Sequence, residues 1–307
     1  MPPPRPVDVV CIASWNTDLV CRVARPIARG ETLMASSFEV LPGGKGSNAA
    51  IACARQGART AVIARIGDDD FGDRGMALWR DEGIETAHVV RAAGERSGVA
   101  QILVYDDGDN GIAVAPGAGA GLTSAHVEAA AGALRAARVV MAPCEVPAAA
   151  ATAAFRIARA AGVTTLLNPA PAMPLPAELL ALTDVLTPNE TELRALAGVA
   201  GTAAVADAAA ALLAHGVRAV AVTLGANGCA LHRPGAPALV LAAHRVAVAD
   251  TVGAGDTFTG ALAAALARGE SLERGVAWAN AAAALSVTGR GAIGGMPGRE
   301  AVEALLR

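Results

Sequence analysis

The stretch DTVGAGDTF, residues 250–258, joins a glycine-rich turn to an alanine-rich segment, residues 257–268, that we expect to be helical. Backbone N–H groups at the start of a helix have no intrahelical partner, so they attract anions. The glycines allow the main chain to approach a ligand closely. Asp256 lies at the junction, where a carboxylate can take a proton from a group bound nearby. An anion cradle beside a base predicts phosphoryl transfer to a hydroxyl group.

A second glycine-rich turn, GGKGSN at residues 43–48, precedes another segment expected to be helical, residues 49–55. Lys45 is the only lysine, because the other 24 of the 25 basic residues are arginine. A planar guanidinium does not replace a compact ammonium, so this lysine is a candidate for a specific role. Helix capping by Ser47 or Asn48 is the structural alternative, but it does not explain three glycines and the lysine together. The GxxxxGK[ST] spacing of a P-loop is absent.

The composition limits the classes of partner. The chain has 307 residues, 53% of them hydrophobic, with a net charge of −3 and a pI near 6.0. This suffices for a large core, and the lack of a basic patch argues against nucleic acid. The uncharged run 160–177 contains Asn168 and four prolines, unlike a membrane-spanning helix. Five irregularly spaced cysteines, and an N-terminus without a signal-peptide core, predict a reduced, cytoplasmic protein without structural zinc.

Strand-like and helical segments alternate along most of the chain, which predicts a mostly parallel sheet covered by helices on both faces. We expect buried strands at 7–13 and 60–66, and helices at 73–82 and 127–135. The acids at 68–70 suit the start of the helix that follows, so we assign them no metal. Extended segments within 19–41 and 97–115 predict a small separate sheet.

Polar residues recur directly after the predicted strands. In open α/β sheets, ligands bind at the carboxyl ends of the strands. The residues in question are Asn16, Asp18, Glu145, Asn168, the run 187–192 and the run 225–228. Each one is compatible with ordinary turn chemistry, but their shared position favours one binding site.

Together these motifs resemble the ribokinase family, also called the PfkB carbohydrate kinases, over residues 9–297. The two glycine-rich motifs carry the resemblance to the whole superfamily. NPAPA at 168–172 and TPNETE at 187–192 resemble ribokinases rather than fructokinases or adenosine kinases. The resemblance implies one three-layer α/β/α domain over 1–307, with a small β-sheet lid from segments about 15–42 and 96–116. It also implies a homodimer formed through the lid.

The resemblance further implies an ATP-dependent sugar kinase that phosphorylates the primary hydroxyl of a pentose, in the first place D-ribose. Asp256 would be the catalytic base, and Gly253, Ala254 and Gly255 would form an anion hole. The sugar pocket would consist of Asn16, Asp18, Gly44, Lys45, Asn48 and Glu145, together with Asp256.

Nucleotide and metal positions follow from the same resemblance. The nucleotide would lie against Asn189, Thr223, Gly225, Gly228, Gly255 and Asn280. Glu192 would hold Mg²⁺ through water. An activating K⁺ would lie among Asp250, Val252, Ser286, Gly289 and Gly291, mostly on their carbonyl oxygens. Gly295 stands where some ribokinases have a serine, which weakens the match at the K⁺ site.

Three alternatives stay open. Another sugar or a nucleoside would make the protein a fructokinase-like enzyme, a deoxyribokinase or a nucleoside kinase. A nicotinamide-linked oxidoreductase needs GxGxxG after the first strand, whereas this chain has ASWN at 13–16. A non-catalytic sugar-binding protein would have no need to combine Asp256, Glu192 and the glycines.

Overall fold

The computed structural model describes residues 7–307 and contains a large sheet of nine strands. They are β1 (Val9–Ile12), β4 (Thr60–Gly67), β5 (Glu85–Ala92), β8 (Val139–Pro143), β9 (Thr164–Asn168), β10 (Val185–Leu186), β11 (Ala219–Thr223), β12 (Cys229–Arg233) and β13 (Ala236–Leu241). Their order is β13-β12-β11-β10-β9-β8-β1-β4-β5. All neighbours from β5 to β11 are parallel, and β12 and β13 are antiparallel at one edge. The mostly parallel sheet is therefore confirmed.

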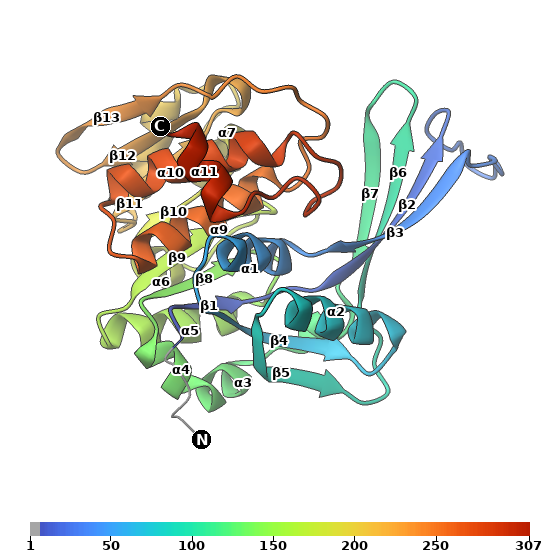
Figure 1. The fold of residues 1–307 in the computed structure, drawn as a ribbon, viewed down its shortest axis with the longest axis horizontal. Coiled ribbons are helices and arrows are strands. Elements are labelled where there is room, and N and C mark those ends of the chain that lie inside the picture. Colours follow the sequence, from blue (N-terminus) through green and yellow to red (C-terminus); the bar gives the residue numbers. More distant parts are fainter. Residues whose placement is uncertain (1–6) are drawn as a thin grey trace.

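Helices cover both faces of this sheet (Figure 1). One face carries α1 (Lys45–Arg55), α2 (Asp70–Asp81), α9 (Ala254–Ala267), α10 (Leu272–Ser286) and α11 (Arg299–Leu305). The other carries α3 (Ser124–Ala129), α4 (Ala131–Ala136), α5 (Ala148–Ala160), α6 (Ala177–Ala181), α7 (Glu190–Ala197) and α8 (Val205–Ala214). In β1, Val9 and Cys11 belong to one core, and Val10 and Ile12 to the other. Alternate side chains of a strand point to opposite faces, so a fully apolar strand serves both layers.

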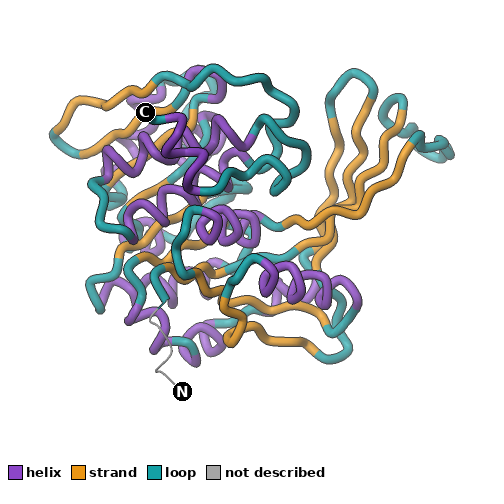
Figure 2. The backbone as a smooth tube through the Cα atoms, in the orientation of Figure 1, coloured by secondary structure: helices purple, strands orange, loops and turns teal. Residues whose placement is uncertain are grey.

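A second sheet of four strands projects from the main body (Figures 1 and 2). It consists of β2 (Asn16–Val23), β3 (Ser37–Gly43), β6 (Gly98–Tyr105) and β7 (Asn110–Ala115), in the order β3-β2-β6-β7. The chain enters it directly from the main sheet, since β1 ends at Ile12 and β2 begins at Asn16. This confirms the small sheet expected from the extended segments.

The starts of three helices differ from the sequence prediction. Helix α1 begins at Lys45 rather than residue 49, α2 at Asp70 rather than 73, and α9 at Ala254 rather than 257. The glycines before α1 and α9, Gly44 and Gly253, have φ of 92° and 79°, so each helix begins directly after a left-handed turn. The residues between the observed and the predicted starts, which were expected to form turns, therefore belong to the first turns of the helices.

Two other elements differ from the prediction. The segment 127–135 is not one helix, because α3 and α4 are separated at Ala130. Strand β5, at the edge of the sheet, was not predicted, since its residues do not form an apolar run. Residues 1–6 of the predicted domain 1–307 lie outside the described residues. Within 7–307, no helix is both long and apolar enough to cross a bilayer.

Candidate active site

The first turn of α9 presents free backbone donors. The N–H of Thr257 donates to the carbonyl of Gly253 at 2.8 Å, and that of Ala254 to Thr251 at 3.3 Å. Among the described residues, the N–H groups of Gly253, Gly255 and Asp256 have no such partner. Unpaired N–H groups at a helix start can bind an anion, and two of the three lie in the predicted set, Gly253 to Gly255.

Asp256 is buried and held by two side-chain amides. Its exposed fraction is 5%, and its Oδ2 accepts a hydrogen bond of 2.9 Å from Nδ2 of Asn48. Its Oδ1 accepts one of 3.2 Å from Nδ2 of Asn168, at the end of β9. Burial raises the pKa of Asp256 to about 6, against the opposing effects of the Lys45 ammonium and the Asn48 amide. A carboxylate with this pKa is ionised near neutral pH and is suited to act as a general base.

A close helix crossing brings Asn48 to Asp256. A Cβ atom at Gly260 of α9 would overlap the carbonyl oxygen of Ala49 and lie 2.8 Å from Cβ of Ala52, both in α1. Asn48 precedes Ala52 by one helical turn in α1, and Asp256 precedes Gly260 by one turn in α9. Both therefore lie on the N-terminal side of the contact between the two helices. The small residue at 260 therefore sets the distance between them.

The predicted sugar residues of β2 face the same region. Asn16 and Asp18 point to one face of the strand because they are two residues apart. Asp18 lies against Gly43 of the neighbouring strand, where a Cβ atom would overlap its carboxylate. Burial raises the pKa of Asp18 to about 6, and the charge of Glu145 adds to this effect.

Glu145 caps the start of α1. Its Oε2 accepts hydrogen bonds from the N–H of Lys45 at 2.8 Å and from the hydroxyl of Ser14 at 2.6 Å. The Ser14 hydroxyl in turn accepts one from the N–H of Gly46 at 3.0 Å. A Cβ atom at Gly44 would lie 2.7 Å from the carbonyl oxygen of Ser14. Asn168 was expected at the site from its position after a strand but was assigned no role there, and it donates to Asp256. Ser14 was not predicted as a site residue, and its position after a strand was its only signal.

The single lysine lies among carboxylates. Asp256 is the main cause of its raised pKa, followed among the acids by Glu145, Glu192 and Asp18. Lys45, Glu192 and Asp256 line a cavity of about 140 Å³ together with Gly253, Ala254, Gly255 and Asn168. One ammonium does not neutralise four carboxyl groups, so this region can bind further cations.

A larger cavity of about 1040 Å³ adjoins this one. All six predicted nucleotide residues line it: Asn189, Thr223, Gly225, Gly228, Gly255 and Asn280. Asn189 and Glu192 form the capping box of α7, in which Oε2 of Glu192 accepts the N–H of Asn189 at 2.9 Å. His244 and Arg245 also line the cavity and were not predicted. Asn189, Thr223 and Gly255 border both cavities, so one elongated ligand can occupy the two.

Residues 7–299 match the family described as pfkB family carbohydrate kinase. The chain belongs to this family. It is 36% identical to a ribokinase from Haemophilus influenzae over 94% of this chain and 95% of that one. It is 32% identical to a deoxyribokinase from Salmonella typhi over 96% and 97% of the two chains. The fold matches a structure of Arabidopsis thaliana ribokinase complexed with ribose and ATP, with a TM-score of 0.91, 33% identity and 99% of each chain covered.

The loops predicted to hold K⁺ in this kinase are tied together by Asp250. Its Oδ1 accepts the N–H of Val252 at 3.0 Å, and its Oδ2 accepts that of Gly291 at 2.8 Å. Carbonyl and carboxylate oxygens are hard donors and suit an alkali cation. At Gly295 a Cβ atom would overlap the carbonyl oxygen of Ser286. A serine in that place does not fit this loop conformation, so any cation here would lack a hydroxyl ligand from residue 295.

Within 7–307, no three His, Cys, Asp or Glu side chains are grouped so that they could hold a metal ion by themselves. Glu192, the predicted Mg²⁺ ligand, lines the cavity beside Asp256.

Proposed function

We propose that this ATP-dependent sugar kinase phosphorylates the primary hydroxyl of D-ribose and releases D-ribose 5-phosphate. The observation that carries the proposal is the buried Asp256. It lies at the start of α9, where its own N–H and those of Gly253 and Gly255 have no partner among the described residues. Its carboxylate contacts Asn48 in the group of predicted sugar residues. The named ribokinase relatives, and the ribose and ATP of the Arabidopsis complex, support ribose as the acceptor.

The sugar would be held by side chains from β2 and α1. Asn48 uses Nδ2 for Asp256, while its Oδ1 is buried and has no hydrogen-bond partner among residues 7–307. A buried acceptor without a partner is unfavourable, and a sugar hydroxyl would satisfy it. Asp18 and Asn16 would accept and donate further hydrogen bonds, and so orient the acceptor hydroxyl toward Asp256.

Asp256 would then take the proton of that hydroxyl as the oxygen attacks the γ-phosphorus of ATP. The unpaired N–H groups of Gly253, Gly255 and Asp256 would stabilise negative charge on the transferred group, and closure of the small sheet would exclude bulk water. Lys45 would contribute positive charge from the side of α1. Bound Mg²⁺ supplies charge neutralisation on the phosphates, and Glu192 would orient one of its waters.

We propose that the four-stranded sheet acts as a lid over the sugar and as the interface of a homodimer. The face that carries Asp18 continues outward through Val20, Ile102 and Ile112, which are adjacent in the strand register. Ile112 and Val114 of this face are 57% and 53% exposed. An exposed apolar face of this kind is typical of a protein interface. Sedimentation should show a dimer that Ile112→Asp dissociates, and a monomeric native protein would contradict the interface.

We also propose that the whole chain, residues 1–307, forms one kinase domain with this lid. A cytoplasmic location is supported by five free cysteines, four of them buried, since buried thiols persist in a reducing compartment.

The test is ADP release with a panel of acceptors: D-ribose, 2-deoxy-D-ribose, D-fructose and adenosine, with Asp256→Asn as the control for background ATP hydrolysis. We expect the highest kcat/KM with ribose. Because one relative is a deoxyribokinase, the comparison of ribose with 2-deoxyribose is the most informative. Preference for a nucleoside would overturn the proposed substrate, and no acceptor-dependent ADP release would overturn the proposed function.

A further inference from the structure

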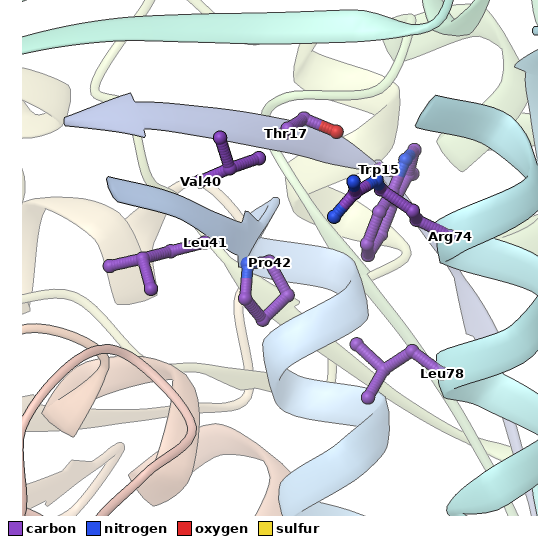
Figure 3. A pocket seen from close by; sticks show the side chains of 7 residues that line it. All are labelled: Trp15, Thr17, Val40, Leu41, Pro42, Arg74 and Leu78. Carbon is purple, nitrogen blue, oxygen red and sulfur yellow. The ribbon is translucent and has the colours of Figure 1, made fainter. Parts of the chain in front are cut away.

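A small pocket lies at the base of the four-stranded sheet, between strands β2 and β3 and helix α2 (Figure 3). Its volume is about 190 Å³, and its lining includes Trp15, Thr17, Val40, Pro42, Arg74 and Leu78. Thr17 stands between Asn16 and Asp18 in β2, so its side chain points to the opposite face of the strand. The pocket therefore shares a strand with the active site without overlapping it.

One wall of the pocket is rigid. The indole of Trp15 donates a hydrogen bond of 2.9 Å from Nε1 to the carbonyl of Phe71, and its ring packs edge-on against Trp79 at 5.7 Å between centroids. A Cβ atom at Gly75 would lie 2.7 Å from Cε2 of Trp15, so helix α2 contacts the indole directly. The pocket is thus preformed between β2 and β3 of the small sheet and α2 of the main body.

Two polar groups in the pocket lack partners. The Thr17 side chain is 1% exposed, and its Oγ1 has no hydrogen-bond partner within 7–307. The guanidinium of Arg74 points into the same space (Figure 3). None of the ion pairs in the described part of the chain includes Arg74. The exposed guanidinium of Arg74 and the buried hydroxyl of Thr17 are therefore both available to a ligand in an otherwise apolar pocket.

We propose that this pocket binds a small organic carboxylate with a compact apolar body. Arg74 pairs with the carboxylate, Thr17 donates a hydrogen bond to it, and Trp15, Pro42 and Leu78 pack against the body. Cavities of about 150 Å³ accept a benzene-sized ligand, so about six to nine heavy atoms fit here. A phosphate, which needs more donors than one guanidinium and one hydroxyl, suits these apolar walls less.

Such a ligand connects the small sheet to α2. Movement of the sheet toward its sugar-facing side carries the opposite face, with Thr17 and Val40, away from α2. A ligand between Arg74 and Thr17 therefore stabilises the present position of the sheet and opposes closure over the sugar. This effect on sugar affinity rests on the proposed function of the sheet as a lid, whereas the binding itself does not.

Benzoate is the probe. Benzamide, which has nearly the same shape but no charge, is the control for the role of the carboxylate. Titration followed by calorimetry and tryptophan fluorescence should give saturable one-to-one binding of benzoate, and at least tenfold weaker binding of benzamide. Arg74→Gln should weaken benzoate binding at least tenfold, and Thr17→Val should also weaken it. Arg80→Gln, which removes another exposed arginine of α2, should not.

No saturable binding to the wild-type protein, or equal binding to Arg74→Gln, would overturn the site. In the kinase assay, saturating benzoate should raise the KM for ribose severalfold in the wild type and leave Arg74→Gln unchanged. An unchanged KM despite saturable binding would refute the coupling to the sugar. A protein without kinase activity would still report on the site through the binding measurements.

Discussion

The side-chain amide of Asn48 donates a hydrogen bond of 2.9 Å to Oδ2 of Asp256, although the two residues are 208 positions apart. Asn48 lies in the first turn of α1 and Asp256 in the first turn of α9. Each of these helices begins directly after a glycine with positive φ. Both helix starts therefore meet at one point. Since the N-terminal end of a helix carries partial positive charge, this meeting point favours carboxylates and phosphates.

Replacement of the base tests the mechanism first. Asp256→Asn should fold and bind ATP but lose turnover by about 10²–10⁴-fold, because an amide cannot accept the proton of the sugar hydroxyl. Steady-state kcat and calorimetric ATP affinity measure the two effects separately. Near-normal turnover in this variant would exclude Asp256 as the base.

The pH dependence of the reaction follows from two buried acids. Burial raises the pKa of Asp256 and of Asp18 to about 6 each. Both must be ionised, one to accept a proton and one to bind hydroxyls, so kcat/KM for the sugar should decline as the pH falls through about 6. Its logarithm should approach a slope of two, and Asp18→Asn should reduce this slope to one. A flat profile down to about pH 5 would contradict both assignments.

A second carboxylate beside the base should move its pKa. Asn48→Asp places a like charge next to Asp256 and removes the amide that stabilises its ionised form. The acid limb of kcat should shift upward by about one pH unit or more. Asn280→Asp is the control, since Asn280 donates to Ala242 instead. If the acid limb of the kcat profile lay at the same pH in both variants, Asn48 would not set the pKa of the base.

The helix crossing should be sensitive to a single methyl group. Gly260→Ala forces α1 and α9 apart, because the new Cβ would overlap the carbonyl of Ala49. We expect a loss of about 1–3 kcal/mol in unfolding free energy and a reduced kcat, since Asn48 and Asp256 separate. Gly132→Ala, at an exposed helical glycine with no atom within 4 Å, should be neutral or slightly stabilising. Denaturant unfolding and kcat check both variants.

Monovalent cations should affect the rate. Asp250 ties the loops of Val252 and Gly291 behind the start of α9, where the predicted carbonyl ligands lie. We expect faster turnover in KCl than in NaCl at equal ionic strength, and a smaller difference in Asp250→Asn. Gly295→Ser should destabilise the loop rather than strengthen the cation effect, because its Cβ would overlap Ser286. Identical rates in the two salts would exclude the K⁺ site.

Much of the fold was predictable from local patterns. Alternating strands and helices predicted the covered parallel sheet, and polar residues after strands, such as Asn16 and Glu145, indicated the edge where the site lies. The starts of α1 and α9 were placed four and three residues late, because Gly44 and Gly253 provide no capping side chain and left-handed glycines resemble loops. Ser14 was missed for a related reason, since its role depends on a contact with Glu145, 131 positions away.

The sequence by itself determined the chemical types and their local setting: two glycine turns before helices, one lysine, and an acid at residue 256. The tertiary structure decided which of these groups meet. The contact of Asn48 with Asp256 depends on the crossing of α1 and α9 at Gly260, and the pKa of about 6 depends on burial by surrounding elements. Local sequence encodes neither, because packing between distant segments sets both the distance and the solvation of the carboxylate.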